Sequence, residues 1–199
     1  MYGVISEVYA RGIRKSECLE ARDRLDGRLK NRSSKRPPKR RGPWLRYWCS
    51  RLSKLSGELT LETRTATGRR PQVTHLAFEP LAVSDAPQGL RLISVLADFG
   101  QGAPTVTNIP LQVTGHALER MIARANLLSR HEWIAELRSA VFLTLPFLGD
   151  EDFLDRLRAL GADERIYIPT RSGYALATQD SNWMVFTTWL HRHDLSDSH

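Results

Sequence analysis

The sequence predicts an α+β fold, in which a small antiparallel sheet packs against two or three helices behind a basic, partly disordered N-terminal extension. Three observations predict it. Hydrophobic residues alternate with a period of two between Glu58 and Val113, as in strands. Helical spacing with capping residues follows between Thr114 and Gly161, and three short alternating segments close the chain. Strands, then helices, then an antiparallel meander are typical of an α+β domain.

The chain divides into two parts of opposite charge. It has 199 residues, of which 41% are hydrophobic, and this is enough for one substantial core. Residues 1–70 hold 19 Lys and Arg against 7 Asp and Glu, whereas residues 71–199 hold 10 against 15. We therefore place a basic arm at 1–56 and an α+β domain at 57–199. The asymmetry indicates an acidic partner, most often nucleic acid; the alternative is a solvated basic tail without a specific ligand.

Three local structures are expected in the basic arm. Residues 13–30 predict a charged, weakly amphipathic helix, and residues 31–43, rich in Lys, Arg and Pro, predict an extended, mobile segment. Residues 44–55 predict a short helix with Pro43 in its first turn. Its aromatic residues alternate with cations and are able to stack on bases, but docking of the helix on the domain is favoured. The candidate phosphate-binding residues of the arm are Lys35, Arg36, Lys39, Arg40 and Arg41.

The domain begins and ends with strands. Alternating segments between turn residues predict the first strands at 59–65, 73–78 and 90–99. Pro110 interrupts a further extended segment at 106–113, so we expect an edge or irregular strand there. The closing strands are expected at 165–169, 174–178 and 182–190.

Helices are expected between these two groups of strands. Thr114 is suited to cap the first helix, and Ser129 begins a capping box for a second helix at 130–143. Asp150 is suited to cap a third helix at 151–160. The acidic residues near that cap are better explained by capping than by metal binding.

The helix that follows Thr114 carries the main catalytic candidates. His116, Arg120 and Arg124 are spaced i, i+4, i+8, so they lie within about 80° of the helix surface. The apolar face beside them is wide enough to dock on a sheet; it contains Ala117, Leu118, Met121, Ile122 and Ala125. An imidazole beside two guanidinium groups is suited to hold a phosphate next to a general base. The alternative is a solvated helix face that the arginines keep soluble.

An enzyme would need further groups from the closing strands. Adjacent strand residues point to opposite faces, so only one of Thr187 and Thr188 can face the helix. The sequence does not choose between them, although the face that Phe186 shares with Thr188 resembles core. The candidate substrate-binding residues of this region are Arg171, Tyr167 and Tyr174.

Several other classes of site are not indicated. The sequence contains no phosphate-binding glycine loop, no HExxH and no CxxC, so we expect no cofactor and no metal. His75 is expected to be structural and His131 to be a surface side chain. Cys18 and Cys49 have neither metal-ligand spacing nor the number for a disulfide framework, which favours a reducing compartment. No segment approaches 18 consecutive apolar residues and the start is not a signal peptide, so no membrane partner is expected.

A helix that begins His116-Ala-x-x-Arg120, with Arg124 four residues later and a small sheet ending in a Thr-bearing strand, resembles a known superfamily. This is the barnase–EndoU–colicin–RelE superfamily of bacterial toxin ribonucleases. The resemblance covers roughly residues 106–190, the expected catalytic core. The segment 144–164 is longer than the superfamily pattern, and residues 1–105 have no counterpart in it.

The resemblance implies metal-independent cleavage of RNA. His116 would remove the 2′-hydroxyl proton or protonate the leaving 5′-oxygen, and Arg120 and Arg124 would stabilise the phosphorane. By position, Thr187 or Thr188 matches the hydroxyl of the last strand. The implied partners are RNA and an antitoxin or immunity protein. The implied site of action is the bacterial cytoplasm, reached, for a secreted toxin, by a route without a cleavable leader.

Two hypotheses from other classes remain beside the toxin-like endoribonuclease. The first is a non-catalytic nucleic-acid-binding protein of phage or plasmid origin, which binds through its basic N-terminal arm. The second is an adaptor whose acidic C-terminal domain docks a protein while the arm localises it.

Overall fold

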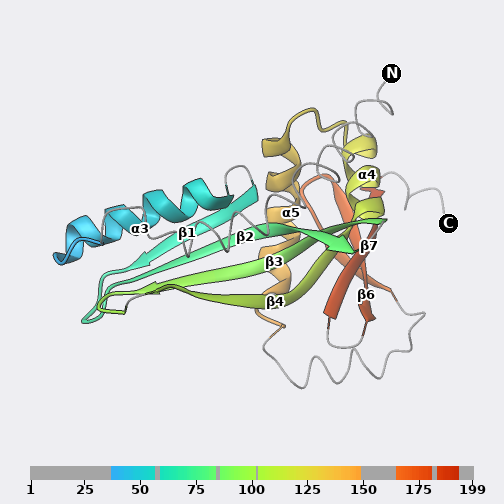
Figure 1. Ribbon diagram of the computed structural model, residues 1–199. Coiled ribbons are helices and arrows are strands. Elements are labelled where there is room, and N and C mark those ends of the chain that lie inside the picture. The colour runs from blue at the N-terminus through green and yellow to red at the C-terminus, as the bar shows by residue number, and fades with distance from the viewer. Residues whose placement is uncertain are drawn as a thin grey trace.

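The computed structural model describes residues 37–56, 59–83, 86–101, 103–148, 165–180 and 183–192, which form three helices and one seven-stranded sheet (Figure 1). The helices are α3 (Arg41–Ser56), α4 (Gly115–Arg124) and α5 (Arg130–Thr144). The strands are β1 (Thr60–Ala66), β2 (Gln72–Val83), β3 (Ala86–Asp98), β4 (Thr105–Thr114), β5 (Ile166–Pro169), β6 (Gly173–Asp180) and β7 (Trp183–His191). The predicted α+β class is confirmed. The helices predicted at 13–30 and 151–160 lie outside the described residues.

The sheet joins two antiparallel meanders. Its strand order is β1-β2-β3-β4-β7-β6-β5, and every neighbouring pair is antiparallel except β4 with β7, which run parallel. The first meander is β1 to β4 and the second is β5 to β7. Helices α4 and α5 lie in the connection between the two meanders, as the order of the predicted elements required.

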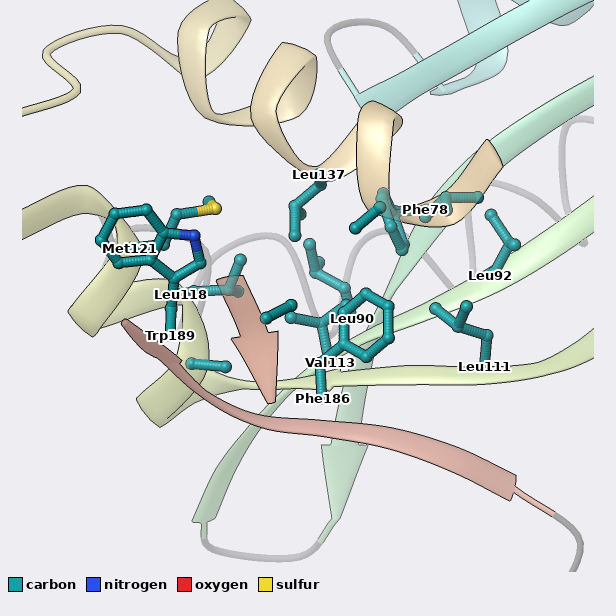
Figure 2. Packing of buried hydrophobic residues seen from close by; sticks show 14 of the residues in the cluster. Phe78, Leu90, Leu92, Leu111, Val113, Leu118, Met121, Leu137, Phe186 and Trp189 are labelled. Atoms are coloured by element: carbon teal, nitrogen blue, oxygen red, sulfur yellow. The ribbon is translucent and has the colours of Figure 1, made fainter. Parts of the chain in front are cut away.

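Described helices pack on both faces of the sheet. We call the face under α4 and α5 the inner face and the face under α3 the outer face. Alternate residues of β3 show the division, since Leu90 and Leu92 are buried in one cluster with α4 and α5. Ile93, Val95 and Ala97 are buried in a second cluster with α3. The inner cluster is the larger of the two, and it draws residues from both meanders (Figure 2).

Helix α3 packs on the outer face through aromatic residues. Trp44, Trp48 and Leu52, spaced i, i+4, i+8, are buried, and the Trp44 ring meets that of Phe99 edge to face at a centroid distance of 5.4 Å. The favoured docking of these aromatics is therefore confirmed, and a helix assigned to the basic arm packs on the sheet. Of the expected extended segment 31–43, residues 31–36 lie outside the described residues, and residues 37–40 are not helical. Residues 41–43 join the helix because Pro43 lies in its first turn, where no backbone N–H has a helical partner.

Strand β4 is irregular, as predicted, but it is not an edge strand. It lies between β3 and β7 in the sheet order. Its register to β3 shifts from Arg91↔Gln112 to Ile93↔Asn108, and Pro110, which has no N–H to donate, lies inside the shift. The edge assignment was wrong because the sequence did not reveal that the second meander joins the sheet by pairing its strand β7 with β4.

The two predicted caps are present. The Thr114 hydroxyl oxygen accepts a hydrogen bond from the Ala117 N–H at 3.1 Å and so begins α4. Ser129 and Glu132 form a reciprocal capping box at the start of α5. Of the apolar residues predicted to dock α4, four are buried in the inner cluster, namely Ala117, Leu118, Met121 and Ile122, and Ala125 is half-buried against it. Local signals therefore fixed the position of the ridge that carries His116.

Candidate nucleic-acid interface

The predicted catalytic ridge of α4 is exposed to solvent. His116, Arg120 and Arg124 all have exposed side chains. The helix is tied to β7 near both of its ends, because the Thr114 hydroxyl donates to the Thr187 carbonyl oxygen at 3.2 Å and Arg124 Nη1 donates to the Trp189 carbonyl oxygen at 3.3 Å. These contacts bring α4 to the backbone of β7.

The two threonines of β7 do not present a hydroxyl to this ridge. Leu176 pairs with Thr188 and Ala177 with Phe186, so Thr187 is the extra residue of a β-bulge. The bulge reverses the alternation, and Phe186 and Trp189 both point into the inner cluster (Figure 2). Phe186 is therefore core, as predicted, but the expectation that Thr188 shares its face was wrong. The Thr187 hydroxyl donates to the Leu176 carbonyl oxygen at 3.3 Å.

Thr188, Tyr167 and Tyr174 lie on the outer face, away from α4. Thr188 and Tyr167 are both cross-strand partners of Leu176, which is flanked by the inner-face residues Ala175 and Ala177. Cross-strand partners share a face and strand neighbours alternate, so these side chains and that of Tyr174 point outward. The structure therefore divides the predicted site residues between two faces and does not bring these side chains into one pocket.

A buried carboxylate holds the turn between β5 and β6. Glu136 of α5 is 3% exposed, and its Oε1 accepts hydrogen bonds from the Thr170 hydroxyl (2.5 Å), the Ser172 N–H (2.9 Å) and the Ser172 hydroxyl (2.7 Å). Thr170 Oγ1 also accepts from Trp189 Nε1 at 3.3 Å and from the Gly173 N–H at 3.0 Å. This network fixes the turn whose exposed residue is Arg171.

Removing this carboxylate is expected to destabilise the fold. Glu136→Ala leaves three donors of the turn without their acceptor, so the free energy of unfolding should fall by about 2 kcal/mol. Glu136→Gln keeps a carbonyl oxygen at the same place and should lose less than half as much. Urea unfolding followed by tryptophan fluorescence measures both variants. Equal losses for Gln and Ala would contradict the role of Oε1 as a hydrogen-bond acceptor.

Two groups of cations that are distant in sequence meet at the end of the sheet away from α4 (Figure 1). Lys39, Arg40 and Arg41 precede or begin α3, and Arg69 and Arg70 lie in the turn between β1 and β2; all five are exposed. The ring contact of Trp44 with Phe99, and the hydrogen bond from the Phe99 N–H to the Pro71 carbonyl oxygen at 2.9 Å, fix this end. We call these five residues the cationic tip. The predicted residues Lys35 and Arg36 lie outside the described residues.

The cationic tip continues along α3. Arg46 and Lys54 are exposed on this helix together with Ser50, whose hydroxyl is a further donor for phosphate. Arg51 is partly buried: it donates to the Tyr47 hydroxyl at 2.7 Å and lies over the Tyr47 and Trp48 rings. The sequence from 27 to 57 contains eleven Lys and Arg and no acid. The solvent side of α3 is therefore a cationic surface on a helix held by buried rings.

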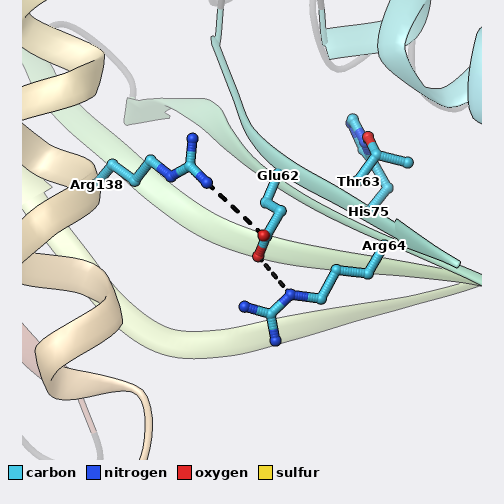
Figure 3. Close-up of polar contacts among 5 residues, drawn as sticks. All are labelled: Glu62, Thr63, Arg64, His75 and Arg138. Carbon is cyan, nitrogen blue, oxygen red and sulfur yellow. Dashed lines mark hydrogen bonds and ion pairs between the residues drawn. The ribbon is translucent and has the colours of Figure 1, made fainter.

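Two other exposed arginines, Arg64 and Arg138, are matched by an acid. Glu62 on β1 lies between Arg64 and Arg138, at 2.6 Å from Arg64 Nε and 3.6 Å from Arg138 Nη2 (Figure 3). Both guanidinium groups also lie over the Phe142 ring of α5. This cluster joins β1 to α5 on the inner face, and its charge is partly neutralised. We therefore do not include it in the cationic tip.

Comparison with known proteins gives no match: no family model, curated protein or solved structure is significantly similar to the chain. The ribonuclease resemblance therefore stays a prediction. Within the described ranges, no group of three or more His, Cys, Asp or Glu side chains could hold a metal ion. None of the described helices is long and apolar enough to span a bilayer.

Proposed function

We propose that the protein binds nucleic acid, RNA in the first instance, and that the cationic tip and the solvent side of α3 contact its phosphates. The observation that carries this proposal is the meeting of Lys39–Arg41 with Arg69 and Arg70 at one end of the sheet. Among residues 37–46, 64–73 and 97–106 the sequence holds a single acid, Asp98. Such a concentration of exposed cations suits a polyanion better than a neutral partner.

The physical basis of binding would be the release of counterions. Each Lys or Arg that neutralises a phosphate frees a condensed cation, so affinity falls steeply as salt rises. This contribution to affinity does not depend on base sequence. Cations at fixed positions on the protein set where the nucleic-acid backbone lies. Helix α3 supplies such positions because Trp44, Trp48 and Leu52 hold it to the sheet.

A salt titration tests the proposal. The full chain is titrated into a labelled single-stranded RNA of about 20 nucleotides, in EDTA, at salt concentrations from about 50 to about 200 mM, and anisotropy is measured. Five phosphate contacts predict a roughly hundredfold loss of affinity across this range, with the RNA left intact. Absence of binding, or binding that ignores salt, would contradict the proposal.

Cleavage of RNA on the α4 ridge is the second candidate. The exposure of His116, Arg120 and Arg124 along one helix that β7 holds in place favours it. It places acid–base chemistry on His116 and phosphate contacts on the two arginines. The separation of Thr188 and both tyrosines onto the other face makes this candidate weaker than binding.

Substitution of His116 decides between the two candidates. If the ridge is catalytic, the wild-type chain degrades RNA in EDTA, and His116→Ala abolishes the cleavage while the circular dichroism spectrum is unchanged. His131→Ala, which removes another exposed imidazole, is the matched control and should cleave as the wild type does. Intact RNA with the wild-type chain, or full cleavage by His116→Ala, would rule out this candidate.

A further inference from the structure

The outer face of β5, β6 and β7 is buried at its centre. Leu176, the cross-strand partner of Tyr167 and Thr188, lies on this face and is 2% exposed. It belongs neither to the inner cluster nor to the cluster under α3. Its partners do not bury it alone, since Tyr167 is itself 52% exposed and Thr188 is short. A leucine on an uncovered sheet face would keep much of its side chain in water, so Leu176 has a cover other than the described helices.

The shielding extends from β6 across the sheet to β2. One row of cross-strand partners crosses the outer face on five neighbouring strands, and every member is half-buried: Glu79, Arg91, Gln112, Val185 and Thr178. Even the ion pair of this row is shielded, because the side chains of Arg91 and Glu79 are 28% and 14% exposed. The cluster under α3 contains no residue of this row and none of β4 to β7. The cover therefore lies beside α3, on the same face.

Three longer stretches of the chain lie outside the described ranges, namely 1–36, 149–164 and 193–199. The first leads directly into α3, the helix that packs on this outer face. The second follows α5, which packs on the inner face, and the third holds a single large apolar residue, Leu195. Connectivity and composition therefore favour the N-terminal stretch as the cover.

The N-terminal stretch is also long enough. Six extended residues, 31–36, span at most about 20 Å, and the helix predicted at 13–30 is about 27 Å long. Together they reach about twice as far as the 16 residues of α3, which span about 24 Å. Strands β6 and β7 lie beyond the end of α3 that is away from the cationic tip (Figure 1). A chain that returns from the tip beside α3 therefore reaches them.

The helix predicted at 13–30 has a narrow apolar stripe. At 100° per residue, Cys18, Leu25 and Leu29 lie within about 40° of its surface, whereas Leu19 lies about 100° away from Cys18. A helix with so few apolar residues is marginal alone and needs a surface on which to pack. The row beside Leu176 is such a surface.

We propose that the N-terminal segment, residues 1–36, packs on the outer face of β5, β6 and β7, with the stripe of Cys18, Leu25 and Leu29 toward Leu176. The basic arm is then part of the α+β domain, and its cations lie beside those of α3. The proposal goes beyond the proposed function, because the packing does not require nucleic acid.

Disulfide trapping with the native Cys18 tests the packing in the full chain. Cys49→Ala removes the other thiol, and Thr178→Cys or Thr188→Cys places one on the outer face. On mild oxidation of a dilute sample, at least one of these should form an intrachain disulfide with Cys18 at least about tenfold faster than His131→Cys, the matched control on exposed α5. Equal rates at all three positions would overturn the proposal, as would linked dimers that increase with concentration, which would assign the face to a second copy.

Protection of a thiol on the face gives a measurement that does not need disulfide geometry. The reporter is Thr178→Cys with Cys18→Ser and Cys49→Ala, and its rate of labelling by a maleimide is measured. Leu25→Asp should raise this rate at least about fivefold, because a carboxylate on the stripe opposes burial, and Leu19→Asp, off the stripe, is the matched control and should not. No increase with Leu25→Asp, or an equal one with Leu19→Asp, would overturn the proposal. An increase with Leu157→Asp instead would assign the cover to 149–164.

Discussion

Arg69→Glu combined with Arg70→Glu is expected to lower the affinity for single-stranded RNA on the order of a hundredfold at about 0.1 M salt. The two substitutions remove two cations from the cationic tip and place two anions next to the phosphate path. Both residues are exposed in the turn between β1 and β2, so the fold should be unaffected. Anisotropy with a labelled RNA gives the affinity, and the slope of affinity against salt should become shallower by about one unit or more.

A variant with the same change of charge elsewhere is the control for this experiment. Arg120→Glu with Arg165→Glu reverses two other exposed arginines, one on the α4 ridge and one before β5. If the cationic tip is the interface, this control should lose less than about fivefold, by the general change of net charge alone. Equal losses in the two double variants would mean that RNA responds to net charge or contacts the α4 ridge as strongly, and that the tip is not the specific interface.

Acidification is expected to destabilise the packing of α3 on the sheet through His75. This residue is fully buried on the outer face of β2, next to the cluster under α3, and a 2.8 Å hydrogen bond joins its Nδ1 to the Thr63 hydroxyl (Figure 3). Burial lowers the pKa of the His75 imidazole from 6.5 to about 4. Between these values the unfolded chain binds a proton that the folded chain does not. The contribution of the neutral His75 imidazole to the free energy of unfolding is therefore complete above pH 6.5 and is lost as the pH falls, by about 3 kcal/mol at pH 4.

Urea unfolding at about pH 7.5, pH 5 and pH 4 measures this loss. Carboxylates also titrate over this range, so the comparison needs His75→Gln, in which a neutral amide can keep a hydrogen bond to Thr63. The difference between the two proteins isolates the imidazole: wild type should lose about 3 kcal/mol more than the variant between the first and last pH. Parallel pH profiles for the two proteins would contradict the burial of a neutral imidazole.

The sequence indicated a structural role for His75 but no partner, since Thr63 reaches it only through the pairing of β1 with β2.

Features set by a few consecutive residues were predictable from the sequence. The caps at Thr114 and Ser129 each depend on a hydroxyl and an N–H three residues later, so sequence spacing specifies them. The apolar stripe of α4 and the alternation of the strands are likewise local. Features that depend on which strands become neighbours were not predictable. The position of β4 inside the sheet and the bulge at Thr187 both arise from pairing with distant segments.

In the candidate site, too, the local features were predictable from the sequence and the long-range ones were not. The ridge of His116, Arg120 and Arg124 was predicted correctly as a helix face, because it follows from helical spacing. Its expected partners were not brought to it, because the bulge at Thr187 and the register of β5 with β6 turn Thr188 and Tyr167 to the other face. Conversely, Arg69 and Arg70 were not singled out as binding residues. They join Lys39–Arg41 only because β1 returns along α3 to the place where the helix begins.

A map of backbone amide shifts on addition of single-stranded RNA to the isotope-labelled full chain tests the central claim most directly. The cationic interface predicts that the largest shifts occur at residues 39–46 and 66–70 and that they diminish as salt is raised. Shifts confined to α4 and the adjoining end of β7, with residues 39–46 and 66–70 unmoved, would contradict it.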